Sequence, residues 1–263
     1  MAVKFGLLCL AATLTFFSLA YADNVTCPPS IKPSNPINKT DYRGRELSKE
    51  YFFNASGTWL KVPLGHLSPW YGAPLEDITP ATPGASEKRM GTGISYAFWM
   101  PTLRWPERDT LSIASSRFCE NGRKMPEDGE FIVIASIENP WLPLSTSPVR
   151  DRLPAERLEN TKKNLGAEFS GTKYDLNYYD GSEEAPFDYF FSGSEPSVIL
   201  QCAKAERVPN PICFGHVWWS MENLGLTVQF SLLDLPRWRE NIDAAYELAH
   251  RWRKAANNGT VAE

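Results

Sequence analysis

Apolar and polar residues alternate most regularly close to the C-terminal end of the chain. Between residues 226 and 231 every second side chain is apolar, which predicts a β-strand with one buried face. Residues 213–221 are strongly apolar, and the Glu-Asn-Leu-Gly segment at 222–225 has a composition typical of turns. These three segments together predict an antiparallel hairpin.

The spacing of apolar residues changes after this hairpin and becomes helical. Five apolar residues recur every three or four positions, which places them on one face of a helix: Trp238, Ile242, Ala245, Ala249 and Trp252. Asp234 is placed to cap the first turn, where Pro236 is tolerated, and the Asn-Asn-Gly segment at 257–259 is expected to end the helix. We expect the apolar face of this long helix to pack on the sheet.

The same patterns predict further elements along the chain. Strands are expected at residues 59–62, 94–100, 111–118, 131–137 and 197–202. Residues 174–191 predict a hairpin that turns at Asp180-Gly181 or in the acidic residues just after it, and Pro154 precedes a short surface helix at 155–165. Strands grouped together, with helices between them and at the end, predict an α+β fold: a mostly antiparallel β-sheet with a long C-terminal helix packed on one face.

The first 22 residues have the pattern of a cleaved secretory signal peptide. Lys4 precedes an apolar run at 5–19, and Ala20-Tyr21-Ala22 is a small-x-small cleavage site. The run is shorter than the roughly 18 to 20 residues that a membrane span needs. We therefore expect a periplasmic or secreted protein without stable membrane insertion. It would consist of a Pro- and Asn-rich extended arm at 23–56, one domain at 57–257 and a disordered tail at 258–263.

Four cysteines follow the signal peptide, and an even number in an exported chain predicts two disulfides. Cys202 and Cys213 flank a short loop between two predicted strands, so they are the first choice for a pair. Closing that loop would contribute about 3 kcal/mol through the entropy of the unfolded chain. Cys27 and Cys119 would then form the second pair, although four cysteines allow three pairings.

Charge and missing motifs narrow the classes of function. The full chain has 27 basic and 31 acidic residues, and with Lys4 removed the net charge is −5, which argues against nucleic acid as a partner. The sequence contains no Gly-x-Ser-x-Gly elbow, no glycine-rich phosphate loop and no His-Glu-x-x-His motif. We predict that the protein is not an enzyme and that it binds neither a cofactor nor a metal ion. We interpret His216, which lies within a predicted strand, as a histidine packed in the core.

Aromatic and acidic side chains are concentrated in the predicted hairpin at 174–191. Such a segment is a solvated acidic turn, a protein-binding surface, or one source of the carboxylate pair of a glycosidase. We predict that a partner protein contacts six residues of this hairpin and three residues near the end of the strand at 94–100: Tyr178, Tyr179, Asp180, Glu183, Glu184, Asp188, Arg104, Trp105 and Arg108.

Two segments carry a resemblance to a known class of protein. The strand-to-turn segment at 98–107 (FWMPTLRWPE) and the strand-to-helix segment at 230–239 (FSLLDLPRWR), in an exported chain, resemble bacterial periplasmic immunity proteins of contact-dependent antagonism, including type VI secretion. The resemblance implies that the protein neutralises a secreted toxin, such as a lipase, phospholipase or cell-wall hydrolase, by occluding its active site. The alternative is a secreted carbohydrate-active hydrolase or lectin-like binder with aromatic platforms.

Overall fold

The computed structural model describes most of the chain after residue 38. The described residues are 39–40, 44–55, 58–67, 79–82, 90–91, 94–105, 131–139, 153–181, 185–207 and 211–258. Several features of the sequence lie outside them: the signal peptide, Cys27, Arg108, Cys119, Glu183, Glu184 and the strand expected at 111–118.

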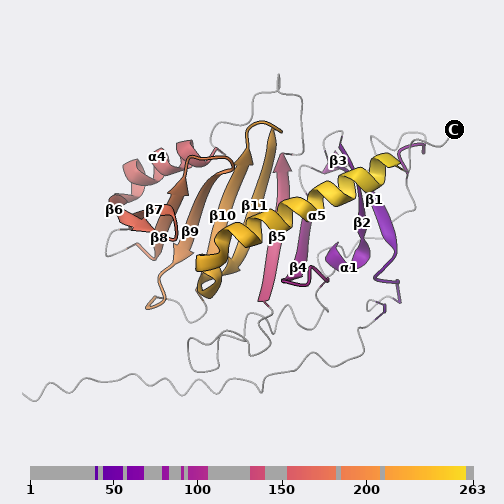
Figure 1. Ribbon diagram of the computed structural model, residues 1–263, viewed down its shortest axis with the longest axis horizontal. Coiled ribbons are helices and arrows are strands. Elements are labelled where there is room, and N and C mark those ends of the chain that lie inside the picture. The colour runs from indigo at the N-terminus through magenta and orange to yellow at the C-terminus, as the bar shows by residue number, and fades with distance from the viewer. Residues whose placement is uncertain are drawn as a thin grey trace, which may run out of the picture.

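An eight-stranded antiparallel sheet forms the body of the protein (Figure 1). In spatial order its strands are Ile94–Met100 (β4), Phe131–Asn139 (β5), Leu224–Ser231 (β11), Ile212–Trp219 (β10), Ser197–Ala203 (β9), Phe187–Ser192 (β8), Leu176–Asp180 (β7) and Glu168–Lys173 (β6). The nearly continuous apolar sequence of β5 fits its interior position between β4 and β11. Of these eight strands, β6 alone was not predicted from the hydrophobic pattern.

The C-terminal helix covers one face of this sheet, as predicted. A 3-10 helix at Leu232–Arg237 (η3) leads into the α-helix Trp238–Asn258 (α5), which crosses in front of the sheet in Figure 1. All five residues of the predicted apolar stripe are buried. These elements confirm the α+β fold with a long helix on an antiparallel sheet.

The start of this helical segment differs from the prediction. Ser231, rather than Asp234, is the N-cap, because its hydroxyl oxygen accepts a hydrogen bond from the backbone nitrogen of Leu233 at 3.0 Å. Asp234 is instead buried within η3, where its carboxylate accepts a hydrogen bond from Arg237 at 2.8 Å. The helical segment therefore begins three residues earlier than the sequence suggested.

A second, three-stranded sheet packs under the far end of α5. It consists of Glu50–Ala55 (β1), Thr58–Pro63 (β2) and Met90–Gly91 (β3), and β2 runs directly into the short helix Leu64–Leu67 (α1). β1 lies within the segment expected to be an extended arm. Tyr51, Phe53 and Ala55 alternate along it and are buried, a pattern that the Pro- and Asn-rich residues before it had obscured.

The opposite face of the large sheet carries the helix Pro154–Leu165 (α4), close to the range predicted for it. It packs over β8, β9 and β10. Leu158 of α4 joins a small buried cluster with Tyr179, Tyr189 and Ile199. Gly166 ends the helix in a left-handed conformation, with φ at 64°.

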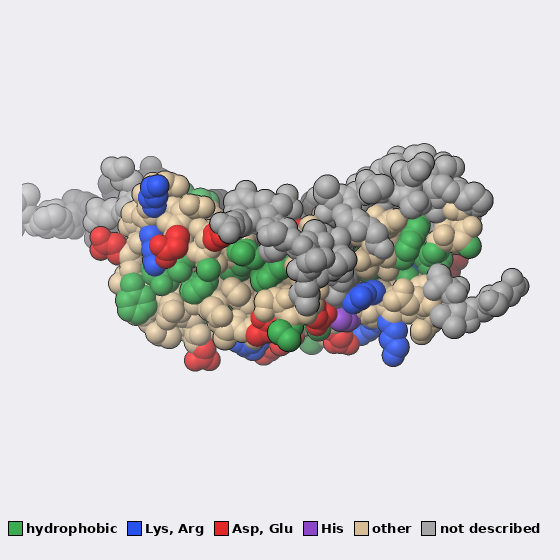
Figure 2. Space-filling model, turned by 90° about the horizontal axis from the view of Figure 1, so that it is seen from above, with side chains coloured by type: hydrophobic (Ala, Val, Ile, Leu, Met, Phe, Trp, Pro, Cys, Tyr) green, Lys and Arg blue, Asp and Glu red, His purple; other side chains and the backbone are tan. Residues whose placement is uncertain are grey.

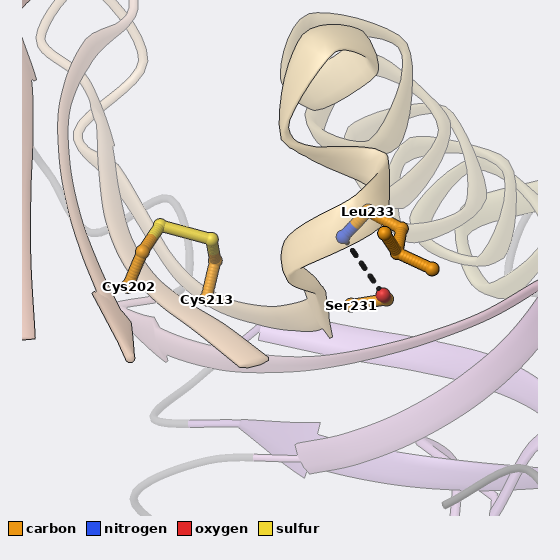
Figure 3. The surroundings of a disulfide bond; sticks show 4 residues. All are labelled: Cys202, Cys213, Ser231 and Leu233. Carbon is orange, nitrogen blue, oxygen red and sulfur yellow. Dashed lines mark hydrogen bonds between the residues drawn. A yellow bond between two sulfur atoms is a disulfide. The ribbon is translucent and has the colours of Figure 1, made fainter. Parts of the chain in front are cut away.

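The predicted disulfide between Cys202 and Cys213 is present (Figure 3). The two residues are directly opposite each other in the β9–β10 pair, and both are buried on the face that α5 covers. The bridge therefore closes the connection between these two strands. No helix within the described ranges is long and apolar enough to span a membrane.

Candidate partner-binding surface

The hairpin formed by β7 and β8 holds the acidic and aromatic residues that the sequence singled out. Because successive side chains of a strand point to opposite faces, Tyr178 and Tyr179 lie on different sides of the sheet. Tyr178 packs beside Phe190 on the α5 face, and Tyr179 joins the cluster under α4. Each tyrosine is only 8% exposed, so most of each ring is buried in the core and cannot contact a partner.

Lys204 draws the two described acidic residues of the hairpin together. Its Nζ lies 3.2 Å from Asp180 Oδ1 and 3.4 Å from Asp188 Oδ1, and it donates a hydrogen bond to the carbonyl oxygen of Gly181 at 3.0 Å. The sequence pattern did not single out Lys204, which follows β9 and reaches the hairpin only through the pairing of β8 with β9. The structure thus builds an ion-pair cluster where the sequence showed only acids.

Burial and the neighbouring charges together shift the pKa values of Asp188 and Lys204. Burial raises the pKa of Asp188 even though Lys204 opposes the shift. Burial lowers the pKa of Lys204, but hydrogen bonds and charges from Asp180 and Asp188 outweigh it, and the net change is upward. With one lysine bonded to both carboxylates, the arrangement stabilises the hairpin and differs from the open carboxylate pair of a glycosidase.

Tyr178 adds an aromatic member to the same cluster. Burial raises its pKa to about 12, and the nearby carboxylates of Asp188 and Asp180 add to the shift. Tyr178 is therefore neutral at physiological pH. The ammonium group of Lys173 lies 3.4 Å from the centre of the Tyr178 ring. This is a cation–π contact at the β6 edge of the sheet.

Tyr174 is an exposed aromatic residue in the turn between β6 and β7. Tyr174 and Asp175 have positive φ angles of 56° and 61°, a conformation that tight hairpin turns require and that Asn and Gly adopt more readily than Tyr. Its carbonyl oxygen accepts a hydrogen bond from Trp238 Nε1 at 2.9 Å, which ties the turn to the start of α5. The Tyr174 side chain is 47% exposed.

Charged groups of both signs surround this turn. Lys173 and Asp175 flank Tyr174, and Arg239 lies over the ring of Trp238 at 4.5 Å. Asp180 is exposed at the opposite end of β7 from the turn. At this end of the molecule, on the left in Figure 2, exposed hydrophobic side chains lie beside basic and acidic ones. We define the exposed surface formed by Lys173, Tyr174, Asp175, Asp180 and Arg239 as the hairpin surface.

Arg104 and Trp105 belong to a different part of the molecule. They follow β4, at the other edge of the large sheet from β6. The Trp105 ring packs on Gly65 and edge-on against His66, while the Arg104 guanidinium lies 5.3 Å from the ring centre of Trp99. Five strand spacings separate β4 from β8, or about 24 Å, so the two groups of predicted contact residues do not form one site.

The histidines of the described regions have packing partners. His216 is buried in β10 against the ring of Phe214, and its Nδ1 lies 3.6 Å from Glu138 Oε2, which agrees with its interpretation as a packed residue. His66 is buried in α1, with Nδ1 2.9 Å from the carbonyl oxygen of Ala97. Within the parts of the chain that the structure describes, no three His, Cys, Asp or Glu side chains are grouped as metal ligands.

Two solved structures are similar to this chain. One is Smlt3025, an immunity protein of the Stenotrophomonas maltophilia type IV secretion system, with a TM-score of 0.50, 11% sequence identity, and coverage of 83% of this chain and 99% of that chain. The other is the Neisseria meningitidis iron-regulated outer membrane lipoprotein FrpD, with a TM-score of 0.45, 12% identity, and coverage of 79% and 94%.

No protein-family model and no curated protein sequence matches the chain. At 11% identity, the first structural likeness is evidence about the fold alone. The chain therefore shares its fold with a solved immunity protein of a bacterial secretion system.

Proposed function

We propose that this protein is an exported immunity protein, which binds a cognate secreted toxin and neutralises it by covering the toxin's active site. The observation that carries the proposal is the likeness in fold to Smlt3025, which extends over nearly all of that protein. That neighbour belongs to a type IV secretion system, whereas the sequence resemblance pointed to type VI. The proposal therefore specifies a toxin of contact-dependent antagonism, with a lipid- or cell-wall-degrading enzyme as the first candidate.

The hairpin surface supports a protein-binding role. Tyrosine and arginine are enriched among the residues that contribute most to binding at protein interfaces, and surrounding charges speed and orient the encounter. Tyr174 offers a large ring on a turn that is tied to α5, so little conformational entropy would be lost when it docks. We infer that the toxin contacts this surface.

Binding and protection test the proposal together. Residues 23–263 with an affinity tag would be produced in the periplasm, and the partner that elutes at equal stoichiometry would be identified by mass spectrometry. The isolated partner would then be directed to the periplasm of a host with and without this protein. We expect the partner to stop growth alone and the protein to restore it, and a partner that is harmless in the periplasm would refute the proposal.

A point variant tests the assigned surface. Tyr174→Ala should weaken toxin binding by about 30-fold or more, equivalent to about 2 kcal/mol, if Tyr174 is a central contact. Met221→Ala is the matched control, because Met221 is 80% exposed in the turn between β10 and β11, at the other end of those strands from Trp238 and Tyr174. If both variants bind the toxin as tightly as the wild type does, the toxin does not bind at the hairpin surface.

A further inference from the structure

Strand β6 is an edge of the large sheet and is open to solvent. Among the described strands it pairs with β7 alone, and five of its six residues are exposed, among them Phe169 at 62%. The outer edge of such a strand presents backbone N–H and C=O groups that can pair with another strand. The residues at its two ends carry opposite charges, Glu168 and Lys173.

A β-bulge in β6 decides on which face each residue lies. Phe169 is opposite Tyr179 and Gly171 is opposite Tyr178, so Ser170 is the extra residue. Glu168 pairs with Asp180 and Lys173 pairs with Leu176. Asp180 and Leu176 are four residues apart on β7 and share a face, so Glu168 and Lys173 also share that face.

This result depends on the bulge. Glu168 and Lys173 are five positions apart, and in a regular strand they would point to opposite faces of the sheet. The bulge brings both charges to the face that α5 covers further along the sheet. Phe169 and Thr172 lie together on the other face, because they pair with Tyr179 and Asn177 of β7, which are two residues apart.

We propose that two copies of this chain pair through β6 in antiparallel orientation about a two-fold axis. Glu168 then lies opposite Lys173 of the partner subunit, and Phe169 lies opposite Thr172 of the partner subunit. Each pair lies on a single face only because both strands carry the bulge. Two eight-stranded sheets become continuous, and the interface is self-complementary, as a two-fold contact requires.

Charge supports a second copy as the occupant of this edge. Among the described residues no ion pair involves Glu168 or Lys173, and the Lys173 ammonium group lies over the uncharged ring of Tyr178. A second β6 supplies the missing opposite charge twice, once at each end. Charges and bulges also protect edge strands from pairing. If the charges and the bulge serve only to prevent pairing, the protein is a monomer. The oligomeric state therefore distinguishes protection of the edge from dimerisation through it.

Sedimentation velocity of residues 23–263 over a range of concentrations measures the oligomeric state. We expect a reversible dimer whose dissociation constant rises with salt, because the paired charges are exposed. Glu168→Lys and Lys173→Glu should each place like charges opposite each other and raise the dissociation constant by about tenfold or more. The double variant Glu168→Lys/Lys173→Glu restores opposite charges and should dimerise about as well as the wild type.

Lys163→Glu on the exposed end of α4 is the control for a change of net charge, and it should leave the dimer unchanged. A wild-type protein that is monomeric at every concentration would overturn the proposal. A dimer that tolerates both single charge reversals, or a double variant that fails to recover, would show that the subunits meet elsewhere. The toxin-binding assay is independent of this measurement, so the two proposals can fail separately.

Discussion

The phenolic hydroxyl of Tyr96 in β4 donates a hydrogen bond to the carbonyl oxygen of Ala245 in α5, across 2.7 Å. Both residues are fully buried, and burial raises the pKa of Tyr96 well above its usual range. The Tyr96 ring also meets the ring of Trp252 edge-on at 4.8 Å. The hydrogen bond and the ring contact of Tyr96 together hold α5 in position against β4, the edge strand of the large sheet.

Tyr96→Phe should therefore lower the free energy of unfolding by about 1 kcal/mol, the usual net contribution of one buried hydrogen bond. Urea titration followed by tryptophan fluorescence measures the change. Tyr174→Phe removes a hydroxyl from an exposed tyrosine and should have no effect on stability. Equal midpoints for the two variants would argue that the Tyr96 hydrogen bond adds nothing to the stability of the fold.

Asp234 should make the protein less stable as the pH rises from about 4 to about 6. Burial raises the pKa of its carboxyl to about 6, against the lowering effect of Arg237. The folded state therefore keeps a proton that the unfolded state has already lost, and this contribution disappears once the folded carboxyl ionises. The full effect is roughly 3 kcal/mol for a shift of about two pKa units.

The variant Asp234→Asn cannot ionise and serves as the reference for this effect. The difference in unfolding free energy between the variant and the wild type, measured in urea at several pH values, should shift in favour of the variant between pH 4 and pH 6. A difference that stays constant over this range would mean that Asp234 is already ionised in the folded protein at pH 4.

His66 should make the protein less stable as the pH falls from about 6.5 to about 4, the opposite pH dependence to that of Asp234. Burial lowers its pKa to about 4, although the hydrogen bond to Ala97 opposes the shift. The unfolded state binds a proton near pH 6.5 and the folded state does not, so stability is lost as the pH falls from 6.5 to 4. His66→Asn retains an N–H donor toward Ala97 and should remove this dependence, which thermal unfolding at pH 5 and pH 7 can measure.

Gly65 is required by the close approach of Trp105. A β-carbon at position 65 would lie 2.3 Å from Cγ of the Trp105 ring, well inside contact distance. Gly65→Ala should therefore destabilise the protein by about 1 to 3 kcal/mol, the usual cost of overpacking. In the background of Trp105→Ala the same change should cost much less. A double-mutant cycle of melting temperatures shows whether the two effects are coupled.

Periodic burial explains which elements could be predicted from the sequence. β4 was predicted with its observed bounds, and the apolar stripe of α5 was identified residue by residue, because each of these elements buries a continuous face. β6 has no buried face, so its sequence EFSGTK carries no alternation to detect. The N-cap was predicted at Asp234, but Asp234 is buried beside Arg237 and Ser231 caps the helical segment instead, which the pattern of apolar residues does not reveal.

The sequence pointed to the hairpin at 174–191 as a candidate site, but it could not show which of the hairpin's side chains are exposed. Tyr178 and Tyr179 are adjacent aromatic residues with the same local sequence context, and the register of β7 decides that each is buried on a different face. Lys204 enters the site through strand pairing across more than twenty residues. Tyr174 is exposed because it occupies a turn, and that turn exists only where β6 pairs with β7.

The path of α5 has a consequence for the order in which the protein can fold. The helix packs on β11 and β5 of the large sheet and on β2 of the small one, so the earliest described strands rest on the last element of the chain. Contacts so distant in sequence form late, since the loop between them must first be closed. Strands β1 and β2 can pair locally, but β2 cannot pack against α5 in a growing chain until residues 238–258 have been synthesised.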